Sequence, residues 1–186
     1  MEKEYLSCAD TAKLVRQTLK RAFPGQKFGV RSSTYSMGAS ISVHYTGGPA
    51  SADVEALVCC YESSHFDGSI DMAFSHSSWL EPDGGACIAH SPGSVGSMGL
   101  FQPVYNDRPS LTSRLVSFGA DSIHVSREPS QVELIQAEAW MKVQGYDYWL
   151  PETIWRLAWG HFDRGFDFED VLTREYGFGF GRKVPA

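Results

Sequence analysis

The side chains best suited to chemistry are thiols and imidazoles between residues 59 and 90. This group consists of Cys59, Cys60, His65, Cys87 and His90. Zinc favours tetrahedral sets of sulfur and nitrogen ligands, so these five residues are candidate metal ligands. Their spacing lacks the Cys-x-x-Cys pair of structural zinc sites, and Cys59 and Cys60 would point to different sides of a helix. Reduced thiols and surface imidazoles are therefore favoured, and a metal-dependent enzyme stays an alternative.

Other patterns that could support catalysis are incomplete. Glu62 and His65 form one half of a carboxylate-bridged metal motif, which needs two such pairs. The glycine-rich stretch 177–183 has no helix after it to hold a phosphate. Two carboxylate pairs suit turns and helix caps better than acid–base catalysis: Asp67 with Asp71, and Asp163 with Asp167. We therefore expect a protein that is not an enzyme and that needs no cofactor.

Charge is distributed in blocks along the 186-residue chain, whose formal net charge is −6. Residues 1–49 contain seven Lys and Arg against three acids, whereas residues 50–100 contain seven acids and no Lys or Arg. Blocks of one sign create local fields that steer charged partners. The other interpretation is that solvated faces of the protein alternate in sign.

Two candidate binding surfaces follow from these blocks. The acidic surface, which we expect to lie against a basic protein partner, consists of Asp53, Glu55, Glu62, Asp67, Asp71, Glu81 and Asp83. The basic surface could follow phosphates, because each neutralised phosphate releases counterions. It consists of Lys13, Arg16, Lys20, Arg21, Lys27 and Arg31. The acidic isoelectric point, near 5.5, makes nucleic acid the less favoured of the two partners.

A third candidate surface is aromatic and lies near the C-terminal end of the chain. Aromatic residues dominate both protein cores and interface hot spots. Residues 154–162 repeat apolar side chains at helical intervals, which predicts core packing there. The stretch before Pro151 is more loop-like and is the better interface candidate, through Tyr146, Tyr148 and Trp149.

The N-terminal part of the sequence predicts an α-β-β-α unit with an antiparallel sheet. Ser7 can cap a helix, and Phe23-Pro24-Gly25 ends it, because proline disfavours helical geometry in the residue before it. Alternating apolar residues then predict two strands that pair as a hairpin. The predicted elements are a helix from Thr11 to Ala22, strands at Lys27–Ser33 and Ala39–Tyr45, and a helix from Ser51 to about Tyr61.

The later sequence predicts an α+β protein with a mainly helical C-terminal lobe. Signals weaken between residues 63 and 109, and Ile123 with Val125 indicates one short strand. Three helix starts follow: Ser130 with Glu133 as a capping box, Pro151 in a first turn, and Asp167 as a cap. The predicted division is an α+β domain at residues 1–90, a loop-rich junction at 91–109 and the helical lobe at 110–186.

Several short motifs between about Leu6 and Asp71 resemble one known family. They are Ala12-Lys13-Leu14-Val15-Arg16, Phe23-Pro24-Gly25, Phe28-Gly29-Val30-Arg31, Gly48-Pro49 and Phe66-Asp67-Gly68. In these motifs the chain resembles type twenty-nine of the large polyvalent protein-associated domains, which are found in phages and conjugative elements. The resemblance implies an accessory protein of a mobile element and carries over no catalytic residue.

From the resemblance and the small size we expect a non-enzymatic, anti-CRISPR-like protein. It would bind a bacterial defence complex, such as a CRISPR effector, through a charged interface and inhibit it. The alternative is a DNA-binding accessory protein of conjugation or plasmid maintenance. The charged N-terminus and the lack of an apolar run of about 20 residues predict a cytoplasmic protein of the bacterial host cell, with no membrane partner.

Overall fold

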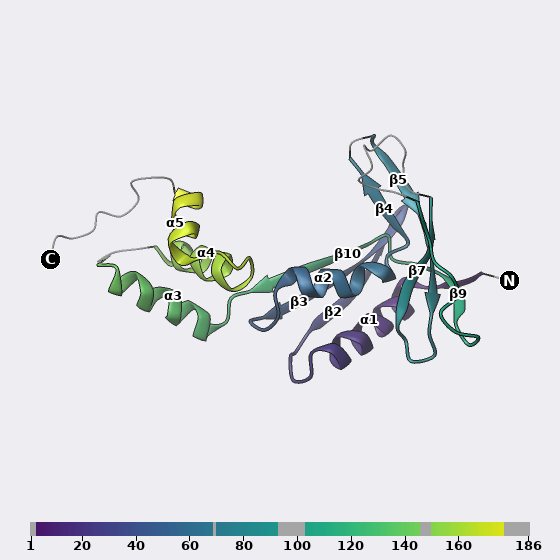
Figure 1. The fold of residues 1–186 in the computed structure, drawn as a ribbon, viewed down its shortest axis with the longest axis horizontal. Coiled ribbons are helices and arrows are strands. Elements are labelled where there is room, and N and C mark those ends of the chain that lie inside the picture. The colour runs from purple at the N-terminus through teal and green to yellow at the C-terminus, as the bar shows by residue number, and fades with distance from the viewer. Residues whose placement is uncertain (1–2, 69, 93–102, 146–149, 177–186) are drawn as a thin grey trace. The chain divides into compact units, whose positions relative to one another are not determined.

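The computed structural model describes residues 3–68, 70–92, 103–145 and 150–176 (Figure 1). These ranges combine helices and strands in mixed sheets, which confirms the predicted α+β class. The chain divides into two compact units. The first unit comprises Met1–His44 and Asp53–Ser126, and the second comprises Tyr45–Ala52 and Arg127–Ala186.

The first unit contains the predicted helix–hairpin–helix arrangement. Helix α1 (Cys8–Ala22) is capped by the Ser7 hydroxyl, which accepts a hydrogen bond from the Asp10 N–H. The elements that follow are β2 (Gly29–Tyr35), β3 (Gly38–Thr46), α2 (Ser51–Val58) and the short 3-10 helix η1 (Cys59–Tyr61). Strands β2 and β3 pair antiparallel, as predicted. The α-β-β-α prediction is therefore confirmed, with strand ends shifted by one or two residues.

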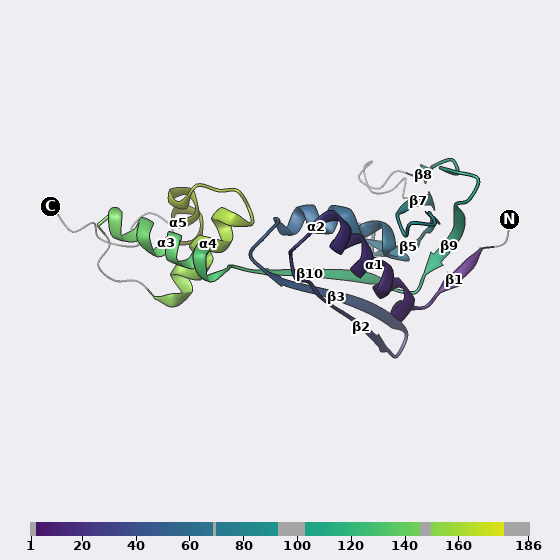
Figure 2. The ribbon, with the colours of Figure 1, turned by 90° about the horizontal axis from the view of Figure 1, so that it is seen from below.

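A three-stranded sheet carries the core of this arrangement, in the order β10-β3-β2 with β10 at Ser122–Glu128. Every second residue of β3 is buried, including Ala39, Ile41 and Val43. Figure 2 shows α1 and α2 on the same face of this sheet. The buried residues of β3 therefore face the apolar stripe of α1, and β2 forms an exposed edge.

Two further sheets of the first unit arise where the sequence signals are weak. The five-stranded sheet has the order β1-β9-β6-β7-β8, and β1 pairs with β9 in parallel. Its strands are β1 (Glu4–Leu6), β6 (Ser77–Leu80), β7 (Ala86–Ser91), β8 (Val104–Tyr105) and β9 (Arg114–Phe118). A separate hairpin joins β4 (Ser64–Asp67) to β5 (Met72–Ser75). Most of these strands were not predicted, because strands of two to six residues carry too little alternation to detect.

The second unit contains the three predicted helices, α3 (Gln131–Val143), α4 (Pro151–Phe162) and α5 (Phe168–Tyr176). Both hydrogen bonds of the Ser130–Glu133 capping box are present, and Pro151 begins α4, so these predictions are confirmed. The core is formed by Ala137, Met141, Ile154, Leu157, Ala158 and Val171. Strands β9 and the start of β10 belong to the first unit, so the mainly helical part begins at Arg127, later than the predicted residue 110.

A buried polar network ties the segment 45–52 to the rest of the second unit. Arg127 is fully buried and donates hydrogen bonds to the Glu133 carboxylate and to the carbonyl of Pro49. The Asp163 carboxylate lies 3.7 Å from the Arg127 guanidinium and accepts hydrogen bonds from the backbone and hydroxyl of Ser51. The segment is therefore fixed by side chains more than 70 residues away in the sequence.

The helices within the described ranges are short or carry charged residues. None of them combines the length and the apolar character that crossing a membrane requires.

Candidate functional site

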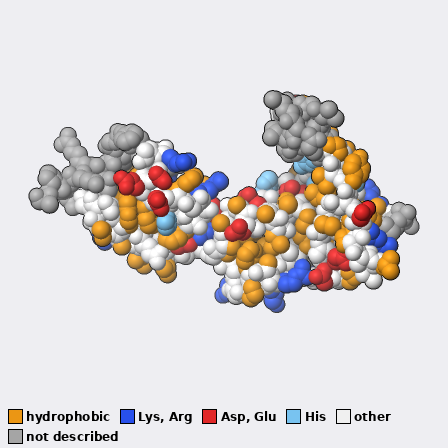
Figure 3. Space-filling model, viewed as in Figure 1, with side chains coloured by type: hydrophobic (Ala, Val, Ile, Leu, Met, Phe, Trp, Pro, Cys, Tyr) orange, Lys and Arg blue, Asp and Glu red, His pale blue; other side chains and the backbone are white. Residues whose placement is uncertain are grey.

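Four exposed cations lie on α1 and on or just before the edge strand β2. Lys20, Lys27 and Arg31 have no acidic partner among the described residues, and Arg16 donates to the Val30 carbonyl at 2.6 Å instead of to a carboxylate. Val30 is buried, so Arg31 lies on the opposite face of β2. Figure 3 shows Lys and Arg side chains gathered over α1 and the turn that follows it. We call Arg16, Lys20, Lys27 and Arg31 the basic edge.

The other two predicted basic residues are neutralised by partners. Lys13 forms an ion pair with Asp10 at 2.7 Å, and Arg21 forms one with Asp83 at 2.7 Å. The backbone N–H of Gly85 and the Arg21 guanidinium both lower the pKa of Asp83. Lys13 and Arg21 therefore add less positive field than the members of the basic edge.

The predicted acidic residues are not gathered on one exposed face. Asp53, Glu55 and Asp71 are exposed, whereas Asp67 is buried. Three others have internal partners, namely Glu62 with the Ile123 N–H, Glu81 with the hydroxyls of Ser110 and Ser113, and Asp83 with Arg21. Burial raises the pKa of Glu62, and the hydrogen bond from Ile123 acts in the opposite direction. The exposed acidic surface is therefore reduced mainly to Asp53 and Glu55 on α2.

The candidate metal ligands stay on separate elements. Among the described residues, no group of three or more His, Cys, Asp or Glu side chains is placed to hold a metal ion. The His65 ring lies against Phe74, and the His90 ring lies against Tyr105. All four cysteines are free thiols, and burial raises the pKa of Cys60 to about 12. Cys59 and Cys87 also have raised pKa values because of burial.

The aromatic interface candidates Tyr146, Tyr148 and Trp149 lie outside the described residues, so that prediction stays open. The neighbouring prediction of core packing holds for part of α4. Ile154 and Ala158 belong to the buried core, and Phe162 packs against it. Trp155 is partly exposed and stacks on Trp159, with 6.1 Å between the ring centroids.

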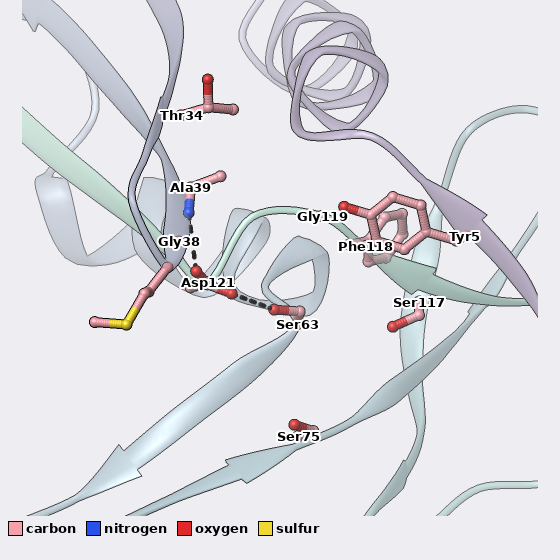
Figure 4. A pocket seen from close by; sticks show the side chains of 11 residues that line it. Tyr5, Thr34, Gly38, Ala39, Ser63, Ser75, Ser117, Phe118, Gly119 and Asp121 are labelled. Atoms are coloured by element: carbon pink, nitrogen blue, oxygen red, sulfur yellow. Dashed lines mark hydrogen bonds between the residues drawn. The ribbon is translucent and has the colours of Figure 1, made fainter.

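Sequence reasoning missed a cleft of about 450 Å³ in the first unit (Figure 4). Five hydroxyl groups line it, from Tyr5, Thr34, Ser63, Ser75 and Ser117. Its lining also includes the Asp121 carboxylate and the Phe118 ring. We call it the hydroxyl-lined cleft. No sequence signal could have found it, because its residues occur singly on segments that only the three-dimensional fold brings together.

The Asp121 carboxylate is held by two hydrogen bonds at the wall of this cleft. One oxygen accepts from the backbone N–H of Ala39 at 2.9 Å, and the other accepts from the Ser63 hydroxyl at 3.2 Å. Gly38 lies beside it, and a Cβ atom there would come within 2.7 Å of Asp121. Glycine is therefore required where the β2–β3 turn meets the carboxylate.

The fold and these surfaces define an α+β protein with exposed charged faces and a hydroxyl-lined cleft. Residues 6–130 match the family described as Large polyvalent protein associated domain 29, and the protein belongs to that family. The match confirms the resemblance, which begins at Leu6 at the end of β1. It also extends the resemblance beyond Asp71 to Ser130, the capping residue of α3. The family places the protein among those associated with phages or mobile elements. No curated protein and no solved structure matched the chain.

Proposed function

We propose that the protein catalyses no reaction and is an accessory factor of a phage or mobile element that binds the nucleic-acid backbone along its basic edge. The observation that supports this proposal is the set of four exposed cations without carboxylate partners on α1 and on or just before β2. The predicted DNA-binding alternative is thereby preferred over the acidic interface, because most of the acidic residues are buried or paired.

The net charge of −6 does not oppose this role. Exposed charges separated by more than about 10 Å are largely screened at 0.1 M salt, so a phosphate at the basic edge responds mainly to the nearby cations. Strand β2 also exposes the hydroxyls of Ser32 and Ser33, which are groups that donate to phosphate oxygens. Neither kind of contact reads base sequence, so the expected binding is independent of sequence.

The salt dependence of binding tests the proposal. Four phosphate contacts give a slope of log K against log salt of about −3.6 for duplex DNA. We therefore expect the triple variant K20Q/K27Q/R31Q to bind a labelled duplex more weakly. We also expect its slope to be less negative than the wild-type slope by about 2 to 3. Fluorescence anisotropy at several salt concentrations measures both effects.

A variant of equal charge separates a local site from a general charge effect. Arg114, Lys142 and Arg156 each form an exposed ion pair elsewhere on the protein. The control R114Q/K142Q/R156Q changes the net charge by the same amount, and we expect it to retain the wild-type slope. Equal loss of binding in both triple variants, or no binding by the wild-type protein at low salt, would contradict the proposal.

A second proposal keeps the predicted inhibition of a bacterial defence complex. The observation that favours it is the exposed pair Asp53 and Glu55 on α2, which has no Lys or Arg partner among the described residues. Such acids suit a basic protein surface, because complementary charge speeds encounter. We expect the protein to inhibit target cleavage by a purified CRISPR effector and D53N/E55Q to inhibit less. Equal inhibition by the variant, or none by the wild type, would remove this proposal.

A further inference from the structure

We propose that the hydroxyl-lined cleft is a binding site for an aliphatic ammonium or guanidinium group, with Asp121 as its counter-charge. Asp121 is the charged side chain among the residues that line the cleft. It forms no ion pair with the described Lys and Arg residues, whose ion pairs involve other acids. This inference is independent of nucleic-acid binding at the basic edge.

The Asp121 carboxylate is already oriented for a ligand. The Ala39 N–H and the Ser63 hydroxyl each occupy one position on its two oxygens. A carboxylate oxygen has two acceptor positions, so each oxygen can accept one more hydrogen bond. In Figure 4 the Ser117 hydroxyl points toward Ser63 and Asp121, into the same space. A cation there would meet the carboxylate and a neutral acceptor together.

The remaining walls suit a small cation. The hydroxyls of Tyr5, Thr34, Ser75 and Ser117 have no hydrogen-bond partner among the described residues, so they can accept from ligand N–H groups. The exposed Tyr5 ring offers an aromatic face, which attracts ammonium and guanidinium groups. The volume of about 450 Å³ is that of a small-molecule site.

Charge decides between a cation and a neutral polyol. An ammonium or guanidinium donor adds the attraction of opposite charges to its hydrogen bond with the Asp121 carboxylate, and a neutral sugar hydroxyl does not, so Asp121 favours a cation. A free polyamine and an arginine or lysine side chain of a partner polypeptide share this chemistry. The cleft therefore selects the chemical group, and the experiment must distinguish its two sources.

Chemical-shift titration of the full chain by ¹⁵N NMR tests the proposal, with four probes. Agmatine and spermidine represent free cations, the acetylated and amidated peptide Ala-Arg-Ala represents a partner side chain, and ribose represents a neutral polyol. We expect both kinds of cation to shift the amides of Ala39, Gly119 and Asp121, and ribose to leave them unchanged. Tighter binding of the peptide assigns the site to a partner, and tighter binding of agmatine or spermidine assigns it to a free ligand.

Two matched variants make the test specific. In D121N the amide oxygen can still accept from Ala39, and the Ser63 hydroxyl can accept from the amide NH₂, so the fold is retained. D107N removes the same charge from an exposed residue outside the cleft. We expect D121N to weaken cation binding about tenfold or more and D107N to have no effect. Absence of cation binding, equal binding by D121N, or equally strong shifts with ribose would each overturn the proposal.

Discussion

Replacing Arg127 with methionine should destabilise the second unit by about 3 to 5 kcal/mol. The Arg127 side chain is 0% exposed, and its two carboxylate partners are 13% exposed for Glu133 and 0% for Asp163. Methionine is apolar and of broadly similar length, so it leaves little empty space. The expected loss is therefore electrostatic, because the buried Asp163 carboxylate and the largely buried Glu133 carboxylate lose the cation that balances them.

The size of this loss distinguishes a buried pair from a surface pair. Removing one partner of a buried ion pair leaves an uncompensated charge in a medium that solvates it poorly. The exposed pair between Arg114 and Glu4 is the matched control, with side chains 56% and 43% exposed. Water solvates those groups after the pair is broken, so R114M should cost less than about 1 kcal/mol.

Urea unfolding followed by tryptophan fluorescence measures the effect. Four of the five tryptophans, at positions 140, 149, 155 and 159, belong to the second unit, so the signal reports mainly on that unit. A third variant, R127M/E133Q/D163N, removes the stranded charges as well and should regain part of the lost stability. The reasoning is refuted if the free energy of unfolding of R127M lies within about 1 kcal/mol of the wild-type value, which is the result expected for R114M.

Three further predictions concern the first unit. Burial raises the pKa of Glu62 above its ordinary value of 4.5. Between pH 4.5 and the raised pKa, the folded state therefore binds more protons than the unfolded state, and the free energy of unfolding falls as the pH rises through this range. E62Q should therefore be more stable than the wild type at pH 7 and equal to it below pH 4.5, as measured by urea unfolding at each pH. Because its pKa is about 12, Cys60 should resist iodoacetamide at pH 8 until the protein unfolds, and rapid labelling detected by mass spectrometry would contradict this. A Cβ atom at Gly119 would lie 2.7 Å from the Leu6 carbonyl, so G119A should cost about 1 to 3 kcal/mol, whereas G29A, with 3.7 Å of room, should be nearly neutral in thermal unfolding.

The parts of the fold that depend on local signals were predictable. The Ser7 cap, the Ser130–Glu133 capping box and Pro151 each act within one helical turn, so the residue types alone indicate where α1, α3 and α4 begin. The β2–β3 hairpin was also accessible, because β3 alternates over nine residues. The five-stranded sheet was not accessible, since its short strands are defined by partners such as β1 and β9 that lie far apart in the sequence.

The candidate sites also differ in how far the sequence alone predicts them. The members of the basic edge lie close together in the sequence, and Arg16 and Lys20 are one helical turn apart, so spacing predicts a basic group there. Spacing did not show that Lys13 and Arg21, which the sequence placed in the same group, are paired with Asp10 and Asp83. The acidic residues also form a block, but their exposure depends on partners in other elements, such as Ile123 for Glu62. The cleft could not be inferred at all, because no property of Ser117 or Asp121 alone indicates that they share a wall.

The interlaced path of the chain limits how this protein can be divided. Residues 45–52 lie between two segments of the first unit, yet they bond to Arg127 and Asp163 of the second. A single cut after β10 would therefore separate the loop around Pro49 from Asp163, which lies in the C-terminal fragment. That fragment would in turn lack Ser51, the hydrogen-bond partner of Asp163. The first unit made as one continuous fragment ending at Ser126 is therefore expected to keep residues 45–52 but to leave them unordered, whereas the full chain holds them in place.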